Sequence, residues 1–293
     1  MIEFEYDAKE KIDWLHAMPF FLVHVLAVVG AIFYPPTWGL VALATGLYLL
    51  RMWAIIVGYH RYFSHRTFKT SRVFQFILGL IGLSSAQKGP LWWAAHHRHH
   101  HRHSDQEPDL HSPTLKGFLW AHVGWILCAK YNDTRFDKIR DFAKYPELRF
   151  LDKHFVAIPI ALGAGLWALG GTAVFVWGGL ISTVFLWHGT FMINSLAHVF
   201  GTRRYETTDS SRNSLLLSLI TLGEGWHNNH HFYPGTARQG FFWWEIDIGY
   251  YTLKALELVG VVWDVRGVPD RVKLQGRRGP DVDESDEALP KAA

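Results

Sequence analysis

One charge-free run limits the possible folds of this chain more than any other feature. From Phe155 to Val199 the sequence contains no Lys, Arg, Asp or Glu. A helix needs roughly 20 apolar residues to cross the hydrocarbon layer of a bilayer, so this run is long enough for two crossings. Leu169, Gly170 and Gly171 are the expected turn between them.

Two more apolar runs lie near the start of the chain. Met18 to Tyr34 is almost wholly apolar, Pro35 and Pro36 interrupt it, and a second run extends from Thr37 to about Tyr59. Proline ends helices, so each run is expected to form its own crossing. The sequence therefore predicts an all-α integral membrane protein with four transmembrane helices in two hairpins, at about residues 18–34, 37–59, 155–169 and 172–195.

The positive charges predict an orientation. Every Lys and Arg except Arg51 lies outside the four expected spans, and neither hairpin turn carries one. By the positive-inside tendency, both termini and the central segment should face the cytoplasm. Arg51 is expected to snorkel or to pair with an acid inside the bundle. No cleavable signal peptide is expected, because the chain starts with acidic and polar residues before any apolar run.

The remaining segments complete a single expected domain, residues 1–272, whose spans are capped on the cytoplasmic side by residues 60–154 and 196–272. Two apolar stretches are too short to span comfortably and are expected at the membrane surface or inside the cap. They are Val73 to Ala86 and Gly117 to Cys128. A third stretch, Phe241 to Val259, is interpreted as an amphipathic helix, and residues 273–293 as a disordered tail.

Cysteine and charge exclude several classes of function. The only cysteine, Cys128, rules out a disulfide framework and any cluster held by four thiolates of this chain. A metal must therefore use nitrogen or oxygen ligands. The net charge of +3 is spread among aromatic and acidic residues, so a nucleic-acid partner is not indicated.

The 18 histidines carry the functional signal. They gather in HRYFSH (60–65), HHRHHHRH (96–103) and GEGWHNNHH (223–231). No expected span separates the first two groups and two spans separate the second from the third, so all three should reach one face of the membrane. Single histidines elsewhere are expected to pack or to be exposed rather than to bind metal. These are His16, His24, His122, His154 and His188.

The spacing within the groups supports a metal site. Residues i, i+3 and i+4 share one face of a helix, and this spacing occurs in both the second and the third group. Each triplet can point three imidazoles at a common centre: His97, His100 and His101, and His227, His230 and His231. His60 and His65 do not share a face of a straight helix, so the helix is expected to end or bend between them. Imidazole suits iron, copper, zinc or nickel, and more than six candidate ligands favour two metals.

The motifs HRYFSH, HHRHHH, NSLAH and GEGWHNNHH together resemble those of the membrane fatty acyl desaturases of the stearoyl-CoA Δ9 type. The resemblance covers roughly Phe20 to Tyr251. It implies four transmembrane helices and a cytosolic domain with a non-haem di-iron centre, that is, two Fe ions. Asn194 matches an asparagine that reaches the metal through water, and nine histidines match the ligands: His60, His65, His97, His100, His101, His198, His227, His230 and His231.

Surplus histidines in the second group, His96, His99 and His103, are expected to support the ligands or to lie at the surface. The resemblance also places Gln87, Trp93 and Thr190 at the bend of an acyl tunnel, although Trp93 is also compatible with an interfacial anchor and Gln87 with a capping or solvent role.

Two departures concern the headgroup of the substrate. This chain has Ala95 and His96 where animal acyl-CoA enzymes carry arginine and aspartate, and Lys88 where they carry asparagine. CoA recognition is therefore in doubt, and an acyl chain on a lipid or carrier protein stays open. Lys88, with Arg66 and Lys69, would meet phosphate on any of these carriers.

The implied reaction needs a redox metal, because no side chain can remove hydrogen from an unactivated methylene. By the resemblance, O2 is consumed, two hydrogens leave adjacent carbons, and an alkene and water result. No flavin fingerprint, cytochrome b5-like segment or ferredoxin cysteine pattern occurs, so a separate electron donor is expected. The resemblance points to ferredoxin or cytochrome b5 with its reductase, docking on the cytoplasmic face.

Three other functions are distinguishable. A di-iron hydroxylase or oxidase of a lipid or hydrocarbon would leave an oxygen atom in the product. A metal transporter would place its ligands within the spans, whereas these histidines lie outside them. A carboxylate di-iron bundle needs two Glu-x-x-His motifs, and only Glu224 to His227 has that spacing.

Overall fold

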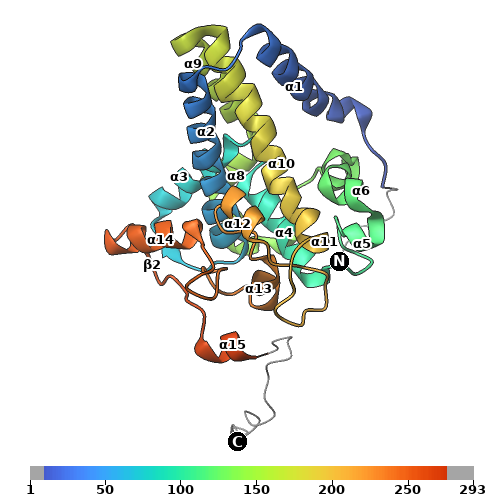
Figure 1. The fold of residues 1–293 in the computed structure, drawn as a ribbon, viewed down its shortest axis with the longest axis vertical. Helices are drawn as coiled ribbons and strands as arrows, with labels where there is room; N and C mark the ends of the chain where they lie inside the picture. Colours follow the sequence, from blue (N-terminus) through green and yellow to red (C-terminus); the bar gives the residue numbers. More distant parts are fainter. Residues whose placement is uncertain (1–9, 276–293) are drawn as a thin grey trace, which may run out of the picture.

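The computed structural model describes residues 10–275, which are mostly helical. Figure 1 shows long helices, α1, α2, α9 and α10, rising from a broader part that carries the short helices and the only sheet seen in the described residues. The long helices and their π-helical extensions are α1 (Trp14–Phe33), α2 (Trp38–Trp53), η1 (Ala54–Ser64), α9 (Ala157–Val174), η5 (Phe175–Ile181), α10 (Ser182–Asn194) and α11 (Leu196–Val199).

Local sequence signals set the ends of the first two long helices. The Asp13 carboxylate caps α1 by accepting a hydrogen bond from the backbone N–H of His16 at 3.2 Å. The Thr37 hydroxyl does the same for α2, accepting from Leu40 N at 3.3 Å. Pro35 and Pro36 lie between the two helices, so the predicted break is confirmed.

The third apolar segment, Ala157–Val199, reverses direction at Gly171. Gly171 has φ 70° and ψ −166°, a conformation that residues with a Cβ rarely adopt. Residues before Gly171 contact residues after it: Gly163 lies against Phe175, and Leu166 lies against Gly178. Residues twelve apart in one straight helix would be about 18 Å apart, so the two halves pack antiparallel. The predicted turn therefore lies where the sequence placed it.

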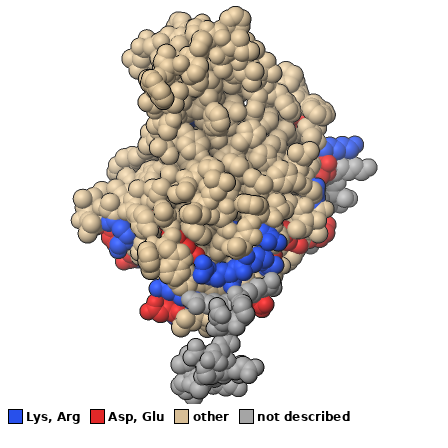
Figure 2. Space-filling model, viewed as in Figure 1, with Lys and Arg blue, Asp and Glu red and all other residues tan. Residues whose placement is uncertain are grey.

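Apolar side chains cover the outside of the long helices. Helical segments Trp14–Phe33, Trp38–Ser64 and Ala157–Val199 are each long and apolar enough to cross a membrane, and only 17% of the first is buried. In Figure 2 the charged side chains gather around the lower part of the molecule, and the upper part shows none on this face. A soluble protein rarely exposes so much contiguous apolar surface. These segments mark a membrane protein.

Arg51 corrects one prediction, because it neither snorkels nor pairs with an acid. Its side chain is 1% exposed and its guanidinium donates only to neutral oxygens. The acceptors are Leu47 O at 3.1 Å, Ser84 O at 3.2 Å, Thr183 Oγ1 at 2.7 Å and Ser182 Oγ. Arg51 thus ties α2 to α10 and to the end of α3 (Arg72–Leu83).

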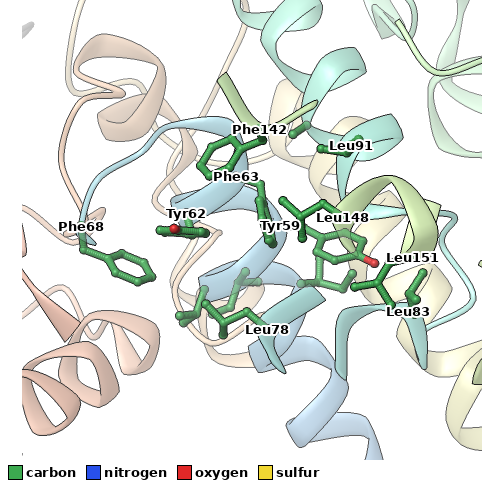
Figure 3. Close-up of a cluster of buried hydrophobic side chains, with 14 of the residues drawn as sticks. Tyr59, Tyr62, Phe63, Phe68, Leu78, Leu83, Leu91, Phe142, Leu148 and Leu151 are labelled. Carbon is green, nitrogen blue, oxygen red and sulfur yellow. The ribbon is translucent and has the colours of Figure 1, made fainter. Parts of the chain in front are cut away.

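The broader part is built from short elements around one hydrophobic core. Figure 3 shows Tyr59 and Phe63 of η1 in one cluster with Leu78 and Leu83 of α3, and Leu148 of α8 (Pro146–Lys153) lies close to Tyr59. The elements are β1 (Lys69–Thr70), α3 (Arg72–Leu83), α4 (Pro90–His103), α5 (Pro113–Lys116), α6 (Phe118–His122), η2 (Gly124–Leu127), η3 (Ala129–Tyr131), η4 (Phe136–Lys138), α7 (Arg140–Ala143), α8 (Pro146–Lys153), α12 (Leu215–Ile220), α13 (His227–Phe232), α14 (Ile248–Leu258), β2 (Val262–Trp263) and α15 (Asp270–Leu274).

Two predicted boundaries need correction. The helix expected over Phe241 to Val259 begins only at Ile248, because the Asp247 carboxylate caps it there by accepting from Tyr250 N at 2.9 Å. The tail expected from Lys273 starts inside α15, whose last residue is Leu274. The rest of that tail, from residue 276, lies outside the described residues. The short strands β1 and β2 pair antiparallel, with Lys69 opposite Trp263.

Candidate metal centre

Four parts of the chain deliver histidines to one buried region of the broader part. They are the end of η1, the helix α4, the short helix α11 and the helix α13. Helix α4 starts at Pro90, a residue suited to the first helical turn, where its missing N–H costs nothing. All nine histidines expected as ligands meet here, in groups of five and four.

The first group comprises His60, His65, His97, His101 and His230, whose ligand atoms lie within 4.8 Å of one another. The Nε2 atom of His230 is 3.0 Å from that of His60 and 2.9 Å from that of His101. The Nε2 atoms of His65 and His97 are 2.9 Å apart. The five rings therefore turn the same nitrogen toward one point.

The second group comprises His100, His198, His227 and His231, again with ligand atoms within 4.8 Å. The Nε2 atoms of His198 and His227 are 3.1 Å apart. His198, which carries no spacing signal of its own, lies on α11 directly after the long helix α10. It joins this group through the packing of the long helices.

Each sequence triplet is divided between the two groups, a division that the spacing alone did not predict. From α4, His97 and His101 enter the first group and His100 enters the second. From α13, His227 and His231 enter the second group and His230 the first. Residues i and i+4 of a helix are nearly aligned, whereas i+3 lies about 60° to one side. The two groups therefore share two helices.

His60 and His65 share a group because η1 is a π-helix. The backbone N–H of His65 donates to the carbonyl of His60 at 3.1 Å, an i→i+5 bond that aligns residues five apart. The helix ends at Ser64, so the expected end between the two histidines is confirmed. Arg98 of α4 fixes this end, since its guanidinium donates to Phe63 O at 2.7 Å and Ser64 O at 2.9 Å.

Buried carboxylates hold the histidines in place. Asp109 Oδ1 lies 2.9 Å from His100 Nδ1, and Asp209 Oδ2 lies 2.7 Å from His231 Nδ1. Glu224 binds His60 Nδ1 in the same way. A carboxylate on Nδ1 fixes the tautomer that leaves Nε2 free to bind a metal. Sequence reasoning had not assigned these acids, although Glu224 stands only three residues before His227.

Asparagines anchor α13 on its other side. Asn229 Nδ2 donates to Gln239 O at 3.0 Å and to Glu245 Oε2 at 2.9 Å. Asn228 Oδ1 accepts from the backbone N–H of Tyr205 at 2.7 Å. Both asparagines are fully buried, so the two residues between His227 and His230 lock the helix while the histidines point to the metal groups.

Burial keeps most of these imidazoles neutral. It lowers the pKa of His97, His101 and His230 well below the usual range, and the neighbouring imidazoles lower it further. Burial also lowers the pKa of His231 to about 4, although Asp209 acts against it. Burial also acts to lower the pKa of His100, but the carboxylates of Asp109, Asp209 and Asp105 together outweigh it, and this pKa is raised. Neutral imidazole is the form that binds a metal.

The donor set fits two metal ions. Nitrogens bound to one ion at about 2.1 Å lie about 3.0 Å apart when their bonds meet at right angles, as in an octahedral site. The Nε2 separations of 2.9 to 3.1 Å match that spacing. His231 Nε2 is buried and has no hydrogen-bond partner among the described residues, while its Nδ1 is held by Asp209. Imidazole donors suit iron, copper or zinc.

A further buried histidine, His111, lies beside the second group. Its ring centroid is 4.2 Å from that of His100 and 5.1 Å from that of Trp125. With His100 and Asp109 it forms a third set of possible ligand atoms, but that set shares His100 with the second group. His111 was not expected from its sequence, where it stands alone.

The surplus histidines of the second sequence group point away from both metal groups. The His96 ring packs on Trp92, with centroids 4.5 Å apart, and its Nδ1 lies 2.8 Å from Trp92 O. His99 Nε2 lies 2.9 Å from Pro108 O. The His103 ring lies tilted against that of His99, with centroids 4.7 Å apart. They support α4 rather than join the groups.

Of the single histidines, three form an unexpected hydrogen-bonded chain. His24 Nε2 lies 3.1 Å from His188 Nε2, and His188 Nδ1 lies 2.9 Å from His122 Nε2. This chain joins α1, α10 and α6 away from the metal groups. His16 lies beside the Asp13 cap, and His154 is exposed.

The residues expected to bind the acyl chain are partly brought together. Gln87 Nε2 donates to Thr190 Oγ1 at 3.0 Å. The Trp93 ring stacks on His97, with centroids 4.9 Å apart. Asn194 ends α10 and is half-buried. Lys88 Nζ donates to Asn132 Oδ1 at 2.7 Å, and burial lowers the pKa of Lys88 to about 8.

A small hollow opens over the metal groups. It has a volume of about 180 Å³, and His101 of the first group and His231 of the second both line it. Arg102, Glu206 and Asp209 lie around the same hollow. The histidine cluster can therefore be approached from the surface at this point.

Apolar helices of membrane-spanning length together with nine converging imidazoles define a class: membrane-bound oxidoreductases with a histidine-rich metal centre. Comparison with known proteins identifies the family. Residues 35–247 match the family model "Fatty acid desaturase", and the chain belongs to this family. It is a fatty acyl desaturase, an oxidoreductase that acts on fatty acyl chains with O2.

The relatives differ in their named substrates. The sn-1 stearoyl-lipid 9-desaturase of Anabaena variabilis is 38% identical over 88% of this chain and 95% of its own length. The Delta-9 acyl-lipid desaturase 2 of Arabidopsis thaliana is 35% identical over 87% and 83%. The icosanoyl-CoA 5-desaturase of Limnanthes douglasii is 34% identical over 87% and 72%. The family therefore includes enzymes with different carriers and double-bond positions.

Proposed function

We propose that this protein desaturates a fatty acyl chain at the Δ9 position, using O2 and two iron ions held by its histidines. The observation that carries the proposal is the convergence of nine imidazoles in two groups within a chain of the desaturase family. Five histidines would hold one iron and four the other, with Asn194 reaching the second site through water. The bound irons would supply the oxidising power that no side chain has.

Iron is proposed over zinc because the reaction is a two-electron oxidation coupled to reduction of O2. Zinc has no redox chemistry, although its geometry would suit the same imidazoles. The protein's part is to bury the nine imidazoles, orient them and hold them close together. Asp109, Asp209 and Glu224 perform the orientation through Nδ1 of their histidines.

The acyl chain is proposed to lie between Trp93 and the Gln87–Thr190 pair. Trp93 stacks on a proposed ligand, so a chain that passes this ring would bring its methylenes close to the metal groups. The hydrogen bond between Gln87 and Thr190 joins the segment after α3 to α10 and would fix the bend of the tunnel. The reacting carbons would then be selected by distance from the bend.

A glycerolipid is the proposed carrier, with acyl-CoA as the competing one. The 38% identical relative is named a stearoyl-lipid desaturase. This chain also has Ala95 where animal acyl-CoA enzymes carry arginine, and its Lys88 ammonium is engaged by Asn132. A lipid substrate would enter from the bilayer in which the long helices lie.

The proposed topology has four spans with both termini and the metal centre in the cytoplasm. The spans would be α1, the α2–η1 helix and the two antiparallel halves of Ala157–Val199. The position of the charged residues around the broader part supports this orientation. An external donor, ferredoxin or cytochrome b5 with its reductase, would deliver electrons at the hollow lined by His101 and His231.

The test is lipid analysis of cells that express the protein with a compatible donor. Gas chromatography and mass spectrometry should show a new Δ9 monounsaturated chain with the wild type and none with His100→Ala or His230→Ala. His154→Ala, a change at an exposed histidine outside the groups, should keep the activity. Full activity in His230→Ala would contradict the ligand assignment, and a hydroxylated chain would indicate a hydroxylase.

The carrier needs a second measurement. Purified protein with the donor is offered stearoyl-CoA and, separately, a stearoyl glycerolipid in nanodiscs. Conversion of the lipid alone is the expected result. Conversion of the CoA ester alone would overturn the proposed carrier without affecting the proposed reaction.

A further inference from the structure

A line of aromatic side chains leads away from the second histidine group, and the proposed reaction does not use it. The centroid of the His100 ring lies 4.2 Å from that of His111, and the His111 ring lies 5.1 Å from the ring of Trp125. The rings of Trp125 and Tyr131 lie with centroids 6.2 Å apart. The line therefore runs from a proposed metal ligand, through adjacent rings, to a tyrosine.

Three neighbouring segments of the chain supply these rings. His111 stands just before α5, Trp125 lies on η2 and Tyr131 lies on η3. The three residues are buried, at 4%, 7% and 3% exposure. Helix α6, which directly precedes η2, lies at the edge of the molecule in Figure 1, so the line leads outward from the metal groups.

Tyr131 has what a tyrosine needs in order to lose an electron, namely an acceptor for its proton. Its hydroxyl donates to the carboxylate of Glu10, whose side chain is 28% exposed. Burial acts to raise the pKa of Glu10, but hydrogen bonds from Lys116 and Tyr131 and the charges of Lys116 and Lys130 outweigh it, and this pKa is lowered. The carboxylate is therefore unprotonated at neutral pH and free to take the phenolic proton.

The middle of the line passes an oxidation on rather than keeping it. Trp125 Nε1 is buried and has no hydrogen-bond partner among residues 10–275. An oxidised Trp125 would therefore keep its proton and carry a positive charge in apolar surroundings, which is costly. Trp92 stacks on Trp125 with centroids 5.8 Å apart, but the ammonium of Lys88 lies 4.8 Å from the centre of the Trp92 ring and opposes removal of an electron there. Oxidation of Trp125 should therefore end at Tyr131.

A second aromatic line, beside the first histidine group, lacks such an end. Trp93 stacks on His97, and its ring centroid lies 6.2 Å from that of Tyr59. The Tyr59 hydroxyl donates to backbone carbonyls, those of Lys88 at 3.2 Å and Gly79 at 3.4 Å. A carbonyl oxygen accepts a hydrogen bond but does not take the proton at neutral pH, so Tyr59 should resist oxidation.

We propose that His111, Trp125 and Tyr131 form an escape route for oxidising equivalents, which protects the histidine ligands when O2 reacts at the metals without an acyl chain in place. This inference rests on the proposed iron centre. An oxidant that can remove hydrogen from an unactivated methylene can also damage the imidazoles that surround it. Indole and phenol rings close to those imidazoles lose electrons more readily and would be oxidised in their place.

One electron and one proton move in each use of the route. Tyr131 is oxidised and gives its electron, through Trp125 and past His111, to the metal centre, which is reduced by one electron. The phenolic proton passes to Glu10, and Tyr131 is left as a neutral radical. A one-electron reductant in solution then restores the phenol, with the proton returned from Glu10. The partly exposed Glu10 carboxylate marks where such a reductant can approach.

The experiment mixes reduced, iron-loaded, full-length protein in detergent with O2 in the absence of an acyl substrate. Electron paramagnetic resonance of freeze-quenched samples should show a tyrosyl radical, assigned by the narrower signal of protein that contains ring-deuterated tyrosine. Tyr131→Phe should abolish this signal, and Trp125→Phe should remove most of it. Tyr251→Phe is the matched control, because Tyr251 lies on α14, is 43% exposed and should not affect the signal.

Two further measurements separate the route from a general loss of structure. Glu10→Gln keeps an acceptor for the hydroxyl but cannot take its proton, so it should lower the yield of tyrosyl radical while both irons stay bound. Peptide mass spectrometry after exposure to O2 should find more oxidised His100 and His231 in Tyr131→Phe than in the wild type. Equal histidine oxidation in the two proteins would overturn the protective role.

The remaining outcomes distinguish the route from the proposed function. The same wild-type preparation, given acyl substrate and electron donor, should form an alkene. Alkene formation without a tyrosyl radical in the substrate-free sample, or a radical that persists in Tyr131→Phe, would overturn the route alone. Absence of both alkene formation and O2 consumption would contradict the proposed reaction and the route together.

Discussion

Removing the charge of Asp209 tests how the protein would hold the metal proposed at the second histidine group. Asp209 Oδ2 lies 2.7 Å from His231 Nδ1, and both side chains are almost fully buried, at 7% and 1% exposure. Asp209 is itself held in place, since its Oδ1 accepts from Ser211 N at 2.9 Å and from Thr207 Oγ1 at 3.1 Å. Asp209→Asn keeps this shape and removes the negative charge beside His231, a proposed ligand.

The expected loss is about 10- to 100-fold in metal affinity at the second group, or about 1.4–2.7 kcal/mol. The pair is buried, so salt should screen it little. Protonation cannot cause this loss. Asp209 raises the pKa of His231, which burial brings to about 4, and its removal lowers that pKa further. The affinity deficit should therefore be constant above about pH 6 instead of growing as the pH falls.

The assay is anaerobic titration of metal-free protein with Fe²⁺ in competition with a chelator, with metal counted by mass spectrometry. Wild type should retain two metals per chain where Asp209→Asn retains one. Asp137→Asn is the matched control, because Asp137 is 46% exposed and contacts only Arg135 and Lys138. Wild-type affinity at both groups, or equal weakening of both, would refute the assigned role of Asp209.

Three further predictions follow from the same contacts. His100→Ala should first lose metal from the four-histidine group, whereas His101→Ala should first lose it from the five-histidine group. Metal spectroscopy would distinguish the two sites. Loss of the same site in both variants would contradict the division of the histidines into these groups. Arg51→Lys keeps the charge, but the lysine cannot reach Leu47 O, Ser84 O and Thr183 Oγ1 together. Thermal unfolding should therefore show a free energy of unfolding lower by about 1–3 kcal/mol. An unchanged unfolding midpoint would contradict the stabilising role of these hydrogen bonds. Gly171→Ala should lower the free energy of unfolding by about 1–3 kcal/mol, because alanine is strained at a φ of 70°. Gly165→Ala is the control, since a Cβ there also meets no atom within 4 Å, and it should cause no such loss. Equal losses in the two variants would contradict the role of Gly171 in the turn.

Much of the fold could be predicted because apolar length and prolines act locally. The break at Pro35 and Pro36 and the reversal at Gly171 depend on residues within a few positions of each event. Arg51 could not be predicted in the same way. Its acceptors on Ser84 and Thr183 are brought to it by helices far apart in the chain, and no acid was required once several neutral oxygens were available.

The candidate site was predictable as a set of residues but not as an arrangement. Spacing selected the triplets on α4 and α13, and resemblance to the family supplied His198, which packing brings beside His227 at 3.1 Å. The supporting acids had no such signal. Asp209 stands 22 residues before His231, and only the folded loop places it on Nδ1.

The division of each triplet follows from helix geometry and explains why the groups contain five and four histidines. On α4 the aligned pair, His97 and His101, belongs to the first group and His100 to the second, whereas on α13 the aligned pair belongs to the second group and His230 to the first. Two helices with the same spacing thus each give two ligands to one group and one to the other, three ligands per group.

The remaining ligands come from the ends of long apolar helices. The π-turn of η1 adds two aligned histidines to the first group, and α11 adds one to the second. Because each histidine group draws on a short helix of the broader part and on a membrane-length helix, the two proposed metals could be held only when those parts are packed together. Metal binding should therefore stabilise the interface between the long helices and the broader part more than it stabilises either part alone.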